Sequence, residues 1–208
     1  MSLRAAVLAQ FGNPQGPLGH LVGLVMARRP SNRQRGLWTV DLLGIQPGDR
    51  ILEVGCGPGV ALGAAAARAL SGETTGLDRS ATMLQQAARR NRAAIAAGRL
   101  KLVEGSVERV SEWPGRFDKI FSVNVVQFFA ERQAALALLA KALRPGGTLV
   151  TTYMPRHRGA DRDSALRMAA EISGHLSAAG LRDIRTEELP LGPVPAIAVI
   201  GRAAPARP

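Results

Sequence analysis

Short apolar runs alternate with longer amphipathic stretches along most of the chain. The short runs are rich in apolar and β-branched residues, which is typical of buried strands, and the stretches between them have the length of helices. Strands and helices that alternate at this spacing favour parallel β-α-β units, with helices covering both faces of the sheet. The expected strands begin at Ile51, Glu73, Leu100, Phe117 and Gly147, and the expected helices span residues 60–70, 81–97 and 131–143.

The pattern changes after residue 153. A charged loop leads into a helix expected from about Ser164 to Ala179, and two more strands are expected at 181–189 and 196–202. A parallel crossover between two strands needs about a dozen residues or more, and the link between these two segments is shorter. We therefore expect the last two strands to form an antiparallel hairpin.

The first 49 residues do not show this alternation. A Gly/Pro-rich loop at 11–19 precedes a short helix expected at 21–29. Ser31 is expected to cap a second helix that runs to about Leu43, where Gly44 ends it. The sequence thus divides into an N-terminal helical cap or lid (1–49), an α/β domain (50–202) and a tail (203–208).

Composition fits one globular domain. A chain of 208 residues with 46% hydrophobic residues can bury a full core. The net charge is +11, carried almost entirely by arginine, since only Lys101, Lys119 and Lys141 are lysines. An arginine-rich, alanine-rich composition is typical of GC-rich genomes, so we interpret the charge as a solvated basic surface with weak attraction for anionic membranes or nucleic acid. Aromatic residues make up 4% of the chain, too few for a base-stacking platform.

Several classes of protein are disfavoured by what the sequence lacks. Cys56 is the one cysteine, which excludes an internal disulfide and a multi-cysteine zinc site. There is no signal-peptide pattern, and no apolar run approaches the roughly 20 residues that span a bilayer. We expect a cytoplasmic, bacterial-type protein without a bound metal; its oligomeric state is not indicated.

The strongest local signal is ILEVGCGPG at 51–59, where a buried strand leads through a glycine loop into a helix. Gly55 and Gly57 allow a ligand to approach the backbone, because they have no Cβ. A dehydrogenase fingerprint has Gly or Ala at position 60, where this chain has Val60, and a P-loop requires Lys followed by Ser or Thr. What remains is E-x-G-x-G-x-G, beginning at Glu53.

This loop resembles the first motif of the class I S-adenosylmethionine-dependent methyltransferases, in particular their small-molecule, type 11-like members. The segments LVEGSVERV, FDKIFSVNVVQFF and LRPGGTLV resemble later motifs in the same order, and the similarity covers about residues 31–202. The resemblance implies a Rossmann-like α/β fold with a seven-stranded, mostly parallel sheet of order 3-2-1-4-5-7-6 and helices on both faces. It also implies S-adenosylmethionine as cofactor, with S-adenosylhomocysteine as product.

The resemblance assigns further roles in cofactor binding. Asp78, at the end of the second strand, is expected to bind the ribose hydroxyls; the alternative is that it only caps the next helix, which Ser80 could do instead. Ser106 stands where the family often has an Asp that reads the adenine, so the Ser106 hydroxyl or the Val107 N–H is expected to do so. Met83 either packs on the adenine or only fills the core. The full expected set is Glu53, Gly55, Cys56, Gly57, Gly59, Asp78, Arg79, Met83, Gly105, Ser106, Val107 and Asn124.

The expected chemistry needs little from the protein beyond positioning, because the methyl group of a sulfonium is already activated. Many relatives carry His near position 127, where this chain has Gln127, and Gln is no general base. This favours an acceptor whose N or S atom is already nucleophilic. The weak candidates for a catalytic group are His20, Gln127, Tyr153 and His157, and the first, third and fourth of these are better explained as ordinary surface residues.

The sequence therefore predicts methyl transfer to a small-molecule acceptor, with the acceptor atom (N, S or O) unresolved. Two alternatives stay open. One is a phospholipid-headgroup methyltransferase whose segment 21–29 lies on an anionic membrane. The other is an RNA methyltransferase or RNA-binding regulator, which the charge favours and the scarcity of aromatic residues opposes.

Overall fold

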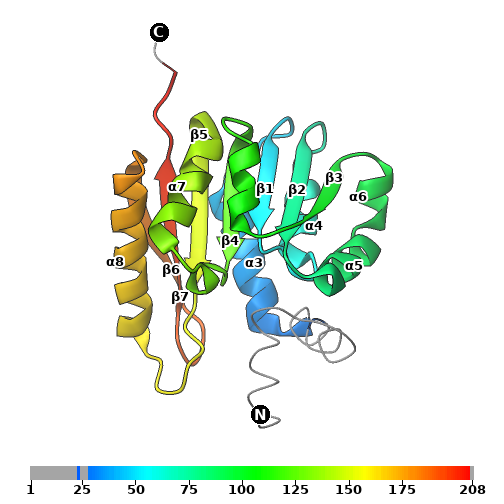
Figure 1. The fold of residues 1–208 in the computed structure, drawn as a ribbon. Coiled ribbons are helices and arrows are strands. Elements are labelled where there is room, and N and C mark those ends of the chain that lie inside the picture. Colours follow the sequence, from blue (N-terminus) through cyan, green and yellow to red (C-terminus); the bar gives the residue numbers. More distant parts are fainter. Residues whose placement is uncertain (1–22, 24–27, 207–208) are drawn as a thin grey trace.

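The computed structural model describes residue 23 and residues 28–206. Its centre is a seven-stranded sheet of order β3-β2-β1-β4-β5-β7-β6 (Figure 1), which confirms the expected fold. β7 is antiparallel to both of its neighbours, so the predicted terminal hairpin is present. The strands are β1 Arg50–Val54, β2 Glu73–Asp78, β3 Leu100–Glu104, β4 Phe117–Val123, β5 Leu143–Tyr153, β6 Arg182–Leu189 and β7 Ala196–Arg202.

Helices cover both faces of this sheet (Figure 1) because alternate strand residues point to opposite sides. In β1, Leu52 and Val54 join one buried cluster, whereas Ile51 joins another on the other side. The first cluster packs against α7 and α8 and the second against α3 and α4. The helices are α3 Pro30–Leu42, α4 Val60–Ala66, α5 Ala81–Arg90, α6 Arg92–Ala96, α7 Arg132–Ala142 and α8 Arg162–Ala178, with 3-10 turns η1 Val107–Glu112 and η2 Val126–Phe128.

α3 lies within the segment expected to form a cap, and its second half belongs to the core. Val40 is buried in the cluster beside β1, β4 and β5. Gly36 lets α3 approach α4 closely, since a Cβ at this position would lie 3.2 Å from the Ala61 Cβ. The first half of α3 faces the carboxyl end of the sheet. The segments expected at 11–19 and 21–29 lie outside the described residues, apart from Gly23, Arg28 and Arg29.

The ends of two predicted helices are corrected by the structure. Ser31 does not cap α3, because the helix already begins at Pro30, whose ring fixes a helical φ and whose missing N–H costs nothing in the first turn. The single helix expected at 81–97 is broken at Asn91, which separates α5 from α6. Leu43 and Gly44 end α3 as expected, with Gly44 at a φ of 58°.

β5 begins four residues earlier than predicted because its first residues find backbone partners. Leu143 pairs with Phe117 of β4. On the other side, the Ala203 N–H donates to Gly147 O at 2.9 Å, and the Gly146 N–H donates to Ala204 O at 3.0 Å. These bonds also attach the start of the tail to the sheet.

Across the described part of the chain, no helix combines the length and the apolar character that a membrane span requires.

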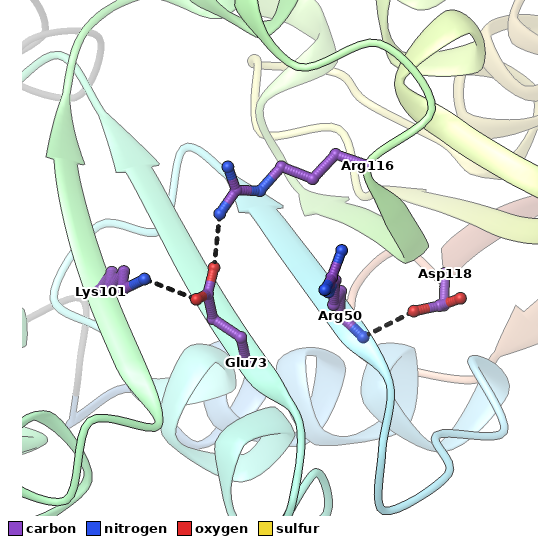
Figure 2. A network of polar contacts seen from close by, with 5 residues as sticks. All are labelled: Arg50, Glu73, Lys101, Arg116 and Asp118. Atoms are coloured by element: carbon purple, nitrogen blue, oxygen red, sulfur yellow. Dashed lines mark hydrogen bonds and ion pairs between the residues drawn. The ribbon is translucent and has the colours of Figure 1, made fainter.

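Charged side chains join the strands at the end of the sheet where β1 and β2 begin. Figure 2 shows Glu73 between two cations, with its Oε2 atom 2.6 Å from Lys101 Nζ and its Oε1 atom 2.8 Å from an Arg116 nitrogen. Beside them, the Arg50 backbone N–H donates to Asp118 at 2.8 Å. The hydrogen bond from Lys101, more than any other contact, lowers the pKa of Glu73, so the ionised carboxylate stabilises the fold.

Replacing Glu73 by Gln should therefore lower stability at pH 7 by about 0.5–1 kcal/mol, a modest amount because both cations are partly solvated. A lowered carboxyl pKa stabilises the folded state above its ordinary value of 4.5, and this stabilisation is lost as the pH falls below that value. Urea unfolding at a series of pH values measures the effect. Glu104→Gln, at an exposed position on β3, is the matched control and should show no such difference. A Glu73 deficit that persists unchanged at low pH would contradict this explanation.

Candidate active site

A cavity of about 710 Å³ opens at the carboxyl ends of the central strands. β1 and β4 are neighbours there, and the chain leaves β1 toward β2 but leaves β4 toward β5. Open α/β sheets bind ligands at such a switch point, because the loops diverge and leave a crevice. The volume suits a ligand the size of a nucleoside together with a small second molecule.

The glycine loop after β1 forms one wall of this cavity. The N–H groups of Gly55 and Cys56 donate to Leu77 O, at 2.7 and 3.1 Å, which fastens the loop to the end of β2. Gly55 must lack a Cβ because one would lie 2.4 Å from a methyl carbon of Val125. Gly57 has a φ of 50° and nothing within 4 Å of where a Cβ would stand. Its bare backbone therefore lets a ligand approach at this point of the loop.

Gly59 is the one residue of the expected cofactor set that does not line the cavity. It faces α5, where an added Cβ would lie 2.8 Å from the Ala87 Cβ. Asn91 Nδ2 donates to Gly59 O at 3.0 Å, and Arg90 Nε donates to Pro58 O at 2.9 Å. Asn91 and Arg90, which hold the glycine loop on the side that faces α5, were not identified from the sequence. The only sequence feature that could have indicated this role is a polar Asn inside an expected helix.

Glu53 places a buried carboxyl group against the cavity. Only 3% of the residue is exposed, and its Oε2 atom has no hydrogen-bond partner. Burial, and next the nearby Asp78 carboxylate, raise the pKa of Glu53 well above its ordinary value, although the Leu62 N–H opposes this. An unpaired acceptor in such surroundings favours a cationic or hydrogen-bond-donating ligand.

Asp78 lies beside it at the end of β2. Its Oδ2 atom accepts the Gly57 N–H at 2.8 Å and its Oδ1 atom accepts the Ser80 N–H at 2.9 Å. Burial raises the pKa of Asp78, and the backbone N–H groups of Ser80 and Gly57, with a smaller effect of the Arg79 charge and backbone N–H, counteract part of that rise. Ser80 caps α5 by accepting the Met83 N–H at 3.3 Å, so the helix does not require Asp78. Each carboxylate oxygen has further lone pairs available to a ligand.

The remaining expected cofactor residues after β2 and β3 line the same cavity: Arg79, Met83, Gly105, Ser106 and Val107. Met83 is 2% exposed, so it belongs to the core as well as to the wall. The Ser106 hydroxyl is hydrogen-bonded to the Glu108 carboxylate, and this bond lowers the pKa of Glu108. The side chain of Ser106 is thus already engaged within the protein.

The end of β4 supplies a third wall. Asn124, at a φ of 55°, lines the cavity, but its amide bridges the strands: Nδ2 donates to Met154 O at 3.0 Å and Oδ1 accepts the Met154 N–H at 2.8 Å. Gln127 Nε2 donates to Asn124 O at 2.8 Å, whereas Gln127 Oε1 is buried without a partner. Gln127 thus lines the cavity and carries a buried acceptor atom that no protein donor satisfies.

The other candidates for a catalytic group lie elsewhere. Tyr153 is in the core beside α7 and α8, where burial raises its pKa, and it does not line the cavity. His157 is exposed, with Nδ1 at 3.2 Å from Arg158 O, and is also outside the cavity lining. His20 lies outside the described residues. Within residue 23 and residues 28–206, no cluster of His, Cys, Asp or Glu could hold a metal ion.

A group of arginines in the cavity lining was not identified from the sequence. Arg29, Arg33 and Arg35 reach the cavity from α3 and the residue before it, and Arg156 reaches it from the loop after β5. Arg35 and Arg156 both donate to Asn32 Oδ1, at 3.0 and 2.8 Å. The sequence signal was the absence of any acidic residue before Asp41.

Comparison with known proteins shows that the chain is similar to methyltransferases. A family model described as a methyltransferase domain matches residues 51–147. An uncharacterized methyltransferase of Bacillus subtilis, YdaC, is 32% identical over 164 residues, which cover 79% of this chain and 87% of YdaC. The chain spans 32% and 24% of the length of two further curated relatives.

Solved structures share the fold. A SAM-dependent methyltransferase from Aquifex aeolicus aligns with a TM-score of 0.68 and 17% identity, over 85% of this chain and 94% of its own. A Haemonchus contortus phosphoethanolamine N-methyltransferase, in complex with phosphomonomethylethanolamine and S-adenosylhomocysteine, aligns with a TM-score of 0.62 and 17% identity, over 83% of this chain and 53% of its own.

Replacing Glu53 by Gln should stabilise the ligand-free protein at neutral pH. A carboxyl group whose pKa is raised on folding contributes its full stability below the ordinary value of 4.5 and loses it as the pH rises through the raised value. The variant should therefore match the wild type near pH 4.5 and exceed it increasingly above, as thermal unfolding at several pH values would show. Glu131→Gln, at an exposed position, serves as the control. Destabilisation by Glu53→Gln at pH 8 would contradict the expected penalty.

Proposed function

From the premise that this chain belongs to the class I S-adenosylmethionine-dependent methyltransferases, we propose that it methylates a small-molecule acceptor by in-line displacement, chiefly through positioning. The observation that supports this most is the buried, unpaired Oε2 atom of Glu53 in the same cavity as Asp78 and the bare backbone of Gly57. These three features suit a ligand with a cationic group, vicinal hydroxyls and a thin chain that passes close to the backbone.

Each group in this part of the cavity has a role that its chemistry suits. Glu53 would accept the ammonium group of the cofactor, and Asp78 would accept the ribose hydroxyls through lone pairs that Gly57 and Ser80 leave available. The Val107 N–H would bind the adenine, because the Ser106 side chain is engaged with Glu108. The remaining wall, including Met83, would exclude water from the adenosine.

The end of β4 suits an acceptor that needs no general base. When bound, S-adenosylmethionine supplies a methyl group on a cationic sulfur, which keeps the electron pair of the broken bond while the acceptor's lone pair forms the new one. Gln127 Oε1 would hold the acceptor by accepting one of its N–H or O–H groups. Among the described residues, the cavity lining contains no His or Tyr, and its one cysteine, Cys56, lies in the glycine loop. We accordingly propose an amine nitrogen or a sulfur as the acceptor atom, with a released proton passing to water.

We also propose that, within the expected cap at 1–49, the part up to the first half of α3 covers the cofactor and completes the acceptor pocket. α3 supports this for its own residues, since its first half lines the cavity while its second half is anchored in the core. The segment before α3 would then enclose the acceptor and exclude water during transfer.

Calorimetric titration with S-adenosylhomocysteine tests the cofactor. Micromolar binding is expected, with none for NADH, and Asp78→Ala should weaken it at least about tenfold because charged hydrogen bonds are lost. Asp118→Ala is the matched control: Asp118 also accepts a backbone N–H but lies at the opposite end of the sheet. Binding of NADH, or of neither molecule, would refute the proposal. Equal loss in both variants would show that Asp78 acts only through folding.

Deletion of residues 1–27 tests the lid, because it leaves Arg29 and α3 intact. The truncated protein should still bind S-adenosylhomocysteine but should lose most labelled-methyl transfer from S-adenosylmethionine to the low-molecular-mass fraction of a bacterial extract. The full chain is the control. A truncated protein that transfers methyl groups as fast as the full chain would disprove the lid.

A further inference from the structure

Four arginines, which we call the arginine cluster, line the cavity from the start of α3, the residue before it and the loop after β5: Arg29, Arg33, Arg35 and Arg156. The cluster belongs to two segments that are distant in sequence. Arg35 and Arg156 share one acceptor, Asn32 Oδ1, so the start of α3 and the loop after β5 are held together at this point.

The cluster has no counter-charge. Within the described residues, none of its members forms a salt bridge with a carboxylate. The residues before α3 supply no carboxylate either, because the first Asp or Glu in the sequence is Asp41. A bound carboxylate or phosphate would therefore be the first strong anion that these guanidinium groups meet.

The lack of a counter-charge destabilises the ligand-free protein most at Arg35, because this cation is buried. It is only 4% exposed, and its guanidinium donates to neutral acceptors, Asn32 Oδ1 at 3.0 Å and the Met154 sulfur at 3.1 Å. Its Nε–H is buried without a partner. Burial, and then the charge of Arg156, lower the pKa of Arg35 to about 10, and burial together with Arg29 lowers the pKa of Arg156. A buried cation with a free donor, beside a second cation, favours an oxyanion ligand.

The cluster lies next to the place where the methyl acceptor should react. Arg35 contacts the Met154 side chain, and the Met154 backbone is bonded to Asn124 at the end of β4. Asn124 in turn accepts from Gln127. The cavity lining thus holds the carboxylates Glu53, Asp78 and Glu108 and also the arginine cluster, which the contacts through Met154 connect to the end of β4.

We propose that the methyl acceptor is an anionic small molecule, whose carboxylate or phosphate group binds the arginine cluster while its reacting atom faces the end of β4. The planar fork of each guanidinium suits two-point binding of either group. The inference rests on the proposed function and specifies its substrate class: a molecule with an oxyanion at one end and an amine or sulfur at the other.

The test is calorimetry on the full chain saturated with S-adenosylhomocysteine. The soluble probes are inorganic phosphate and succinate, with the neutral succinamide as control. Vesicles of phosphatidylglycerol, compared with phosphatidylcholine, ask whether the anion comes from a lipid headgroup. The variants are Arg156→Gln and Arg35→Met, and Arg158→Gln is the matched control because Arg158 is exposed in the same loop but does not line the cavity.

Binding of phosphate or succinate that falls at least tenfold in Arg156→Gln and Arg35→Met, but not in Arg158→Gln, supports a soluble anionic acceptor. The same dependence for phosphatidylglycerol vesicles alone supports an anionic headgroup. Because Arg156 is exposed, its variant should fold even if Arg35→Met does not.

Two results would overturn the inference. The first is anion binding that is absent, or that is equal in all variants. The second is a tenfold loss of S-adenosylhomocysteine affinity in Arg156→Gln, since the cluster would then serve the cofactor's own carboxylate. If the wild-type chain fails to bind S-adenosylhomocysteine at all, the proposed function fails instead, and the two failures are therefore distinguishable.

Discussion

The active-site cavity depends on the attachment of the glycine loop to the end of β2. Leu77 O accepts the N–H groups of Gly55 and Cys56, and the Asp78 carboxylate accepts that of Gly57. These bonds hold the loop in conformations that glycine tolerates, and they set the Asp78 side chain against the loop. Asn91 and Arg90 secure the same loop from the α5 side. Because these bonds restrict the conformations of the loop before any ligand binds, the loop loses little conformational entropy on binding.

Charge in the cavity is distributed in keeping with methyl transfer from a cation. Carboxylates line the cavity where the cationic cofactor is proposed to bind, and the arginine cluster lines it from α3 and the loop after β5, connected through Met154 to the end of β4. Both groups are held without full compensation inside the protein: Glu53 has an unpaired oxygen and Arg35 an unpaired N–H. Such groups reduce the stability of the ligand-free fold, and a ligand of the opposite charge at each end would relieve that cost. The net charge of the chain is therefore partly a property of this site and not only of composition.

The parts of the site that could be predicted are those formed by neighbouring residues. Gly55, Gly57 and Asp78 follow directly after strands whose periodicity is clear, and the carboxyl ends of parallel strands meet at one edge. The parts that could not be predicted are side chains brought in from other elements. Nothing local distinguishes Gly59, which packs against α5, from Gly57, which faces the cavity. Likewise, Tyr153 was a candidate by its place after a strand, but the side on which it points puts it in the core.

The sequence by itself determined the order of strands and helices, the antiparallel end of the sheet and the glycine loop, because periodicity and turn chemistry act over a few residues. Helix ends were determined less well. The fixed φ of Pro30 starts α3 before the cap expected at Ser31, and Asn91, whose side chain bonds to Gly59 O, separates α5 from α6. Only the tertiary structure decided which arginines are surface charge and which line the cavity. That distinction depends on how α3 packs across β4 and β5. The positions of charged residues along the chain do not specify which side chains they will contact in the fold.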